Sequence, residues 1–132
     1  MIFRSKHRFI GAEFDWLAVD RANRTALFAT AGDGPIPSVL DSDAYESVPL
    51  ITNILALPPI CDAVEVARAP GEHGEWFEVA RRGVYAYDWS RRDKAYILIA
   101  RPTRQGDIAE ELRRVAVRLD VDFATCEQFT PL

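Results

Sequence analysis

Residues with the chemistry for acid–base or metal work lie mainly in one short run of the chain. There are two histidines, His7 and His73, and histidine is the side chain that most often acts as a base at neutral pH. His73 has Glu72 and Glu75 close by in the run PGEHGE. Because this run lacks further ligands at helical spacing, we expect a surface loop there and no metal site. A small enzyme or ligand-binding domain that uses these three residues remains the alternative. His7 belongs to an alternating basic segment and is expected to be a solvated strand residue.

Signatures of the common enzyme classes are absent from the sequence. It contains no GxSxG elbow, no Walker loop and no GxGxxG. The Gly32-Asp33-Gly34 segment lacks the lysine of a phosphate loop, and Asp33 would repel a phosphate, so a plain turn is expected. We therefore predict a protein that is not an enzyme and that uses no metal or cofactor.

Four acids and one tyrosine lie between residues 33 and 46. A negative patch with an aromatic anchor speeds the encounter with a basic partner and helps to select it. The alternative is a solvated loop before a helix N-terminus, where the helix dipole favours acids. The candidate partner-binding residues are Asp33, Asp41, Asp43, Tyr45 and Glu46.

Length and charge restrict the kinds of partner. The chain has 132 residues, 48% of them hydrophobic, which is enough for one compact domain over residues 1–132. A net charge of -4 works against binding to nucleic acid or to an anionic membrane surface. No apolar run resembles a signal peptide or reaches the roughly 20 residues needed to span a bilayer. The expected location is the cytoplasm, where Cys61 and Cys126 would remain buried thiols.

Two pairs of apolar, strand-like runs flank polar turns. The first pair, Glu13–Val19 and Thr25–Thr30, is joined by DRANR, whose Asp and Asn favour tight turns. The second pair, Val84–Trp89 and Lys94–Ala100, is joined by SRRD. Both patterns predict β-hairpins.

Other segments predict helices and short strands. Apolar spacing from Val48 to Leu57 favours a helix that Pro58 and Pro59 end, and a shorter helix is expected between Glu75 and Gly83. The last helix is predicted from an Asp107 cap to Leu119, because Ile108, Leu112, Val115 and Leu119 form one stripe. Short strands are expected at 61–67 and 122–129. The chain is thus expected to be an α+β domain in which two β-hairpins form a mostly antiparallel sheet packed against two to three helices.

An aromatic face accompanies the second hairpin. Tyr85, Tyr87 and Trp89 alternate along one strand and so share one side of it. They could stack bases or bind a partner, but the net negative charge favours a core position under a helix. A structural or regulatory subunit that uses this face as an oligomer interface is a further alternative.

The segments EFDWLAVD, ALFATAG, GPIP and VYAYDW resemble a family of small, acidic bacterial proteins encoded beside polymorphic or contact-dependent toxins. These are immunity proteins, which neutralise a cognate toxin in the producing cell. The resemblance covers the N-terminal third and the second predicted hairpin. It implies a non-enzymatic protein that binds a toxin domain tightly, with a basic toxin suited to the acidic chain. It implies no particular contact residue.

Overall fold

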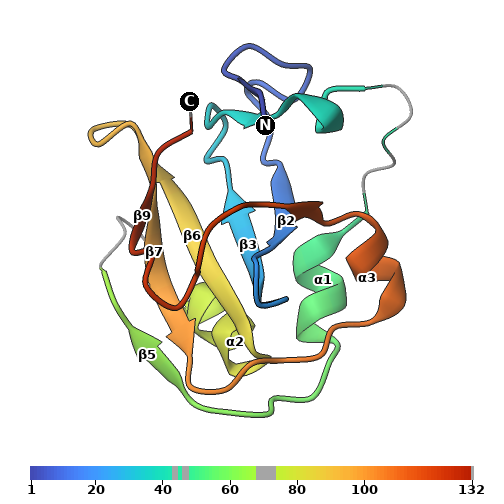
Figure 1. Cartoon of the computed structure of the whole chain (residues 1–132), viewed down its shortest axis with the longest axis vertical. Helices are drawn as coiled ribbons and strands as arrows, with labels where there is room; N and C mark the ends of the chain where they lie inside the picture. The colour runs from blue at the N-terminus through green and yellow to red at the C-terminus, as the bar shows by residue number, and fades with distance from the viewer. Residues whose placement is uncertain (43–44, 46–47, 68–73, 132) are drawn as a thin grey trace.

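The centre of the fold is a mixed β-sheet. The computed structural model describes residues 1–42, 45, 48–67 and 74–131. Strands of the main sheet follow the order β5-β7-β6-β3-β2-β8, and β9 also pairs with β7 (Figure 1). Their bounds are β2 Asp15–Val19, β3 Thr25–Ala29, β5 Ala63–Glu65, β6 Val84–Ser90, β7 Ala95–Pro102, β8 Val117–Arg118 and β9 Gln128–Phe129.

A second, two-stranded sheet and four short helices complete the described chain. The small sheet pairs β1 (Phe3–Arg4) with β4 (Ile36–Pro37). The helices are η1 (Ser38–Leu40), α1 (Leu50–Leu55), α2 (Gly74–Arg81) and α3 (Glu110–Arg114). Among the described residues, no helix has the length and apolar character to cross a membrane.

The pairing of the strands makes the sheet mixed. Strands β2 and β3 pair antiparallel, as do β6 and β7. The two pairs meet through a parallel pairing of β3 with β6, and β8 adds parallel to β2. The chain between β3 and β6 forms β4, α1, β5 and α2, which provides the long connection that parallel neighbours need. The structure is therefore of the α+β class.

Each face of the sheet carries its own apolar cluster. On one face, Leu17, Leu27 and Ala86 occupy one row and pack with residues of α1, α2 and α3. On the other, the rings of Trp16, Phe28 and Tyr87 occupy the next row. They stack with centroid distances of 4.3 Å and 4.7 Å. Alternation along each strand separates the two sets, so we call these the helix face and the aromatic face.

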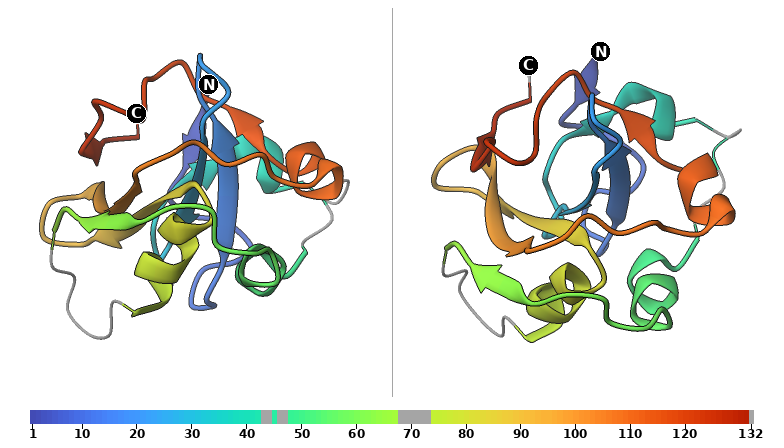
Figure 2. Two further views of the ribbon diagram at one scale, coloured as in Figure 1. Left: turned by 90° about the horizontal axis from the view of Figure 1, so that it is seen from below. Right: turned by 60° about the horizontal axis from the view of Figure 1, so that its bottom comes forward.

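The aromatic face is buried, but none of the three α-helices in the described chain packs on it, and Leu40 of the short 3-10 helix η1 is the one helical residue in its buried cluster there. Tyr87 is completely buried, and Phe123 and Phe129 of the C-terminal segment pack on the rings of this face. Figure 2 shows α1 and α2 on one side of the sheet and the C-terminal segment on the other. The expectation of a core position was correct and that of a helical cover was wrong.

The last predicted helix is much shorter than its apolar stripe. Helix α3 begins after Ala109, without a side-chain cap, and ends at Arg114. The stripe residues divide between the two clusters, because Ile108 and Leu112 pack on the helix face whereas Leu119 packs on the aromatic face. A continuous helix could not reach both sides, and Val117 instead pairs with Ala18 in the sheet. Tertiary contacts here override a helical pattern.

Candidate functional site

Asp41 of the predicted acidic patch is used inside the fold. Its carboxylate accepts the backbone N–H of Arg8 at 3.1 Å and lies 3.5 Å from Nη1 of Arg4. Its side chain is only 13% exposed. These contacts tie the N-terminal segment to the end of η1, so Asp41 already has cationic and N–H partners within the chain.

Asp33 and Tyr45 are also engaged. Oδ2 of Asp33 lies 2.9 Å from Nε of Arg91, and its Oδ1 is buried without a hydrogen-bond partner among the described residues. Tyr45 packs its ring edge-on against Phe14 at 6.3 Å, and burial raises the pKa of its hydroxyl. Asp43 and Glu46 lie outside the described residues.

The structure tests the expectation for one of the two histidines, His7. His7 is buried and lies at a turn; its Nε2 donates to the carbonyl of Gly34 at 2.9 Å, and its Nδ1 accepts the N–H of Phe9 at 3.2 Å. The prediction of a solvated strand residue was wrong, because this segment folds back onto the loop after β3. His73 and Glu72 lie outside the described residues, and within those residues no group of three potential ligands could hold a metal ion.

A different pair of acids shares one row of the helix face. Asp15 of β2 pairs with Ala29 of β3, and Ala29 pairs with Asp88 of β6. We call these three residues the Asp15–Asp88 row. With strands spaced about 4.8 Å apart, the two acidic residues are separated by about 10 Å along the row. Alternation places Asp15 on the same face as Leu17 and Asp88 on the same face as Ala86.

The carboxyl group of Asp15 has an unfavourable environment for its charge. Burial, followed in importance by the neighbouring carboxylates of Glu75, Glu13 and Asp88, raises its pKa to about 6. Glu75 comes from the first turn of α2 and Asp88 from β6. The carboxyl group of Asp15 has no hydrogen bond or ion pair within the described part of the chain. Asp15 is thus a partly buried acid without a compensating cation.

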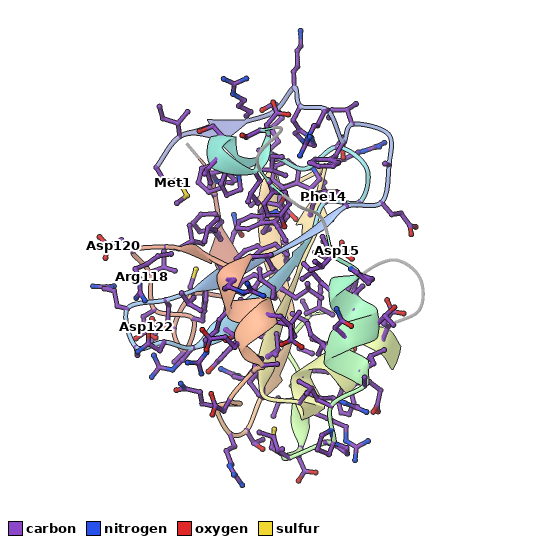
Figure 3. The ribbon with its side chains drawn as sticks, turned by 90° about the vertical axis from the view of Figure 1, so that its right-hand side faces the viewer. Met1, Phe14, Asp15, Arg118, Asp120 and Asp122 are labelled. Carbon is purple, nitrogen blue, oxygen red and sulfur yellow. The ribbon has the colours of Figure 1, made fainter. Side chains whose placement is uncertain are left out.

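Hollows adjoin the row at both ends. One, of about 450 Å³, lies between Asp15 and the start of α1 and is lined by Val48, Leu50 and Ile51 among others. The other, of about 800 Å³, borders Asp88 and has an apolar floor that includes Ile97 and Ile99. Figure 3 shows Asp15 where β2 approaches α1. The row is therefore accessible beside apolar surface.

Arginines border the larger hollow beyond Asp88. Arg91 and Arg92 contribute to its lining together with Asp93. Arg91 is engaged with Asp33, and Arg92 lies 3.5 Å from Asp93. Both guanidinium groups are thus directed to acids other than Asp15.

Asp15 and Asp88 lie in predicted strands, and the sequence pattern predicts no role for either of them. One signal was present, since each strand contains an Asp-Trp pair, Asp15-Trp16 and Asp88-Trp89. An acid at an otherwise apolar strand position that faces the interior marks a site for inspection. Bringing the two acids into one row requires the parallel pairing of β3 with β6, which hairpin patterns do not predict.

Two kinds of chemistry suit this arrangement. A carboxylate held among other carboxylates attracts a cationic group, and a carboxyl that titrates near neutral pH has the properties of a general acid or base.

Comparisons of the chain with protein-family models, curated protein sequences and solved structures found no match.

Proposed function

We propose that this protein is an immunity protein that neutralises a cognate bacterial toxin by direct, non-enzymatic binding. It would act in the cytoplasm of the producing cell, on a toxin domain with a basic surface. The observation that carries the proposal is Asp15, a partly buried carboxyl that has acidic neighbours and forms no ion pair with a cation of the described residues.

The electrostatic argument concerns what a partner would relieve. Above pH 6 the carboxylate of Asp15 is ionised in an environment that disfavours its charge. A lysine or arginine from a partner would remove that penalty. Its ion pair with Asp15 would therefore contribute more binding free energy than an ion pair with an ordinary exposed acid. Asp15 is already partly desolvated in the free protein, which lowers the desolvation cost of association.

The apolar surroundings favour a protein partner over a free cation. Val48 and Ile51 are partly buried beside Asp15, and Ile97 is partly buried beside Asp88. The aliphatic stem of a lysine or arginine can pack on such groups while its charged end meets the acid. A centre with apolar contacts and one desolvated charge is typical of binding hot spots.

A small enzyme is the second candidate function. The pKa of Asp15, raised to about 6, is in the range useful for a general acid or base. In that case Glu75 would act together with Asp15. The site would then differ from the predicted one, in which Glu72, His73 and Glu75 act together. The interface alternative that used the aromatic face has no comparable support, because Tyr85 and Tyr87 are buried within the chain.

The experiment is neutralisation and co-purification with the product of the adjacent gene. Asp15→Asn should weaken binding by at least about tenfold, since it removes the charge while keeping the shape. Asp120→Asn is the matched control: Asp120 is 92% exposed and forms its ion pair with Arg21. Its binding should equal that of the unsubstituted protein.

The two parts of the proposal fail in different ways. If Asp15→Asn binds and protects as well as the unsubstituted protein, the assigned site is wrong. If no toxin-like neighbour exists and no adjacent-gene product co-purifies, the immunity function is wrong. An activity that Asp15→Asn abolishes, without any protein partner, would establish the enzyme instead.

A further inference from the structure

A polar hollow lies at the opposite end of β2 from Asp15. It has a volume of about 460 Å³ and lies between the β2–β3 turn and the segment from Gln105 to Arg118. We call it the arginine pocket, because two guanidinium groups are its strongest charges. Its lining residues are Val19, Asn23, Gln105, Gly106, Asp107, Arg113 and Arg118.

Arg118 is held in place by the β2–β3 turn. Its Nη1 donates to the carbonyl of Asp20 and its Nη2 to Oδ1 of Asn23, both at 3.3 Å. Asn23 adopts a left-handed backbone conformation, with φ of 60°, that asparagine tolerates better than most residues. Only two of the five N–H groups of this guanidinium meet an acceptor within the described chain.

The remaining lining groups add donors and a rigid wall. Arg113 pairs with Asp107, and Gln105 donates from Nε2 to the carbonyl of Asn23 at 3.1 Å. The backbone at Gly106 passes so close to Arg82 that an added Cβ would lie 2.4 Å from the Arg82 carbonyl oxygen. The wall at Gly106 is therefore fixed by backbone packing.

Charge and hydrogen bonding both select the class of ligand. Two guanidinium groups against one carboxylate leave the lining net positive. The unused groups of Arg118 are all donors, and a guanidinium has no acceptor to offer a cation. Arginine forks match the paired oxygens of carboxylates and phosphates.

We propose that the arginine pocket binds an oxyanion, with Arg118 as its main contact and Arg113 as a second. The oxyanion is either the phosphate of a small phosphorylated molecule or a carboxylate. This site is independent of the proposed toxin contact, because it lies at the other end of β2 and has the opposite charge.

The experiment is an NMR titration of the intact ¹⁵N-labelled protein with inorganic phosphate and, separately, with glutamate, at constant ionic strength. We expect saturable shifts of the Asn23 and Gln105 side-chain amides and of the Gly106 backbone amide. Binding should be in the range of about 1–10 mM, as for one small ion. The anion with the lower dissociation constant identifies the source.

Three variants make the titration decisive. Arg118→Gln should weaken binding by at least about fivefold. Arg113→Gln, which leaves the β2–β3 turn untouched, should weaken it to a smaller extent and decides the matter if Arg118→Gln does not fold. Arg92→Gln is the control, because its side chain is 90% exposed outside the pocket. Shifts that do not saturate, or that persist unchanged in both pocket variants, would overturn the proposal.

Discussion

Asp15 and Asp20 lie at the two ends of β2, and their carboxylates have opposite environments. Asp20 is completely buried, but its oxygens accept the backbone N–H groups of Ala22, Arg24 and Phe123 at 2.8–2.9 Å, and the Arg24 guanidinium lies 3.4 Å away. Asp15 is less buried, and the charged groups that shift its pKa are all acidic. The comparison shows that partners, more than burial, decide what a buried charge costs.

This difference distinguishes an acid that holds the fold together, Asp20, from an acid whose carboxylate is available to a ligand, Asp15. Asp20 joins the β2–β3 turn to the C-terminal segment through Phe123, and Arg24 extends the contact to Asp122 at 3.1 Å. All of these groups are used within the fold. The carboxylate of Asp15 has no hydrogen bond or ion pair within the described chain, and in the proposed function a basic partner compensates its charge.

The largest expected effect is the loss of Asp20. Asp20→Ala would leave three backbone N–H groups without their acceptor and would leave the Arg24 guanidinium with Asp122 alone. We expect the free energy of unfolding to fall by about 3–5 kcal/mol, measured by urea denaturation at pH 7. A loss below about 1 kcal/mol would mean that water replaces these bonds and that the comparison is unsound.

Removing the charge of Asp15 should increase the free energy of unfolding, in contrast to the loss of Asp20. The folded-state pKa of Asp15 is raised from 3.8 to about 6, so the folded protein holds this proton more tightly than the unfolded chain does. The carboxylate therefore lowers stability above pH 6, and the penalty disappears as the pH falls toward 4. Asp15→Asn should be more stable by about 1–2 kcal/mol at pH 8, after allowance for solvent screening.

The pH dependence supplies the check on that prediction. The stabilities of the two proteins, measured by urea denaturation between pH 4 and pH 8, should agree at the acidic end, diverge as the pH rises from about 4, and reach their full difference near pH 6. A constant difference across this range would show that packing of the Asn side chain, and not the charge, is responsible.

Arg24 tests whether the cation matters at the Asp20 end. Arg24→Gln keeps the backbone N–H groups that donate to the Asp20 carboxylate but removes the ion pairs with Asp20 and Asp122. We expect a loss of about 1 kcal/mol by thermal or urea unfolding. A loss as large as that of Asp20→Ala would assign the stabilisation to the ion pair, against the account given above.

The smallest effect concerns the acid next to Asp15. Glu75→Gln removes the neighbour that contributes most, after burial, to the raised pKa of Asp15. The pKa of Asp15 should fall by about half a unit with little change in stability. Glu110→Gln, an exposed acid on α3, should leave the Asp15 titration unchanged. An unchanged titration in Glu75→Gln as well would show that burial alone shifts the pKa.

How far the sequence predicts these two environments depends on chain separation. The turn containing Asp20 follows from its Asp and Asn residues, but the partner at Phe123 is 103 residues away and leaves no local pattern. The environment of Asp15 combines β2, β6 and α2, which only the sheet order brings together. The apolar pattern identifies most strands, whereas it extends α3 too far because it does not show which face of the sheet each apolar residue meets.

The most direct test of the account is the titration of the Asp15 carboxyl carbon by NMR, with Asp15→Asn used for assignment. An acid without a compensating cation is predicted to titrate with a midpoint near pH 6. A midpoint near 3.8, the ordinary value for aspartate, would show that the protein places no net penalty on the charge of Asp15. The proposed contact for a basic partner would then be contradicted.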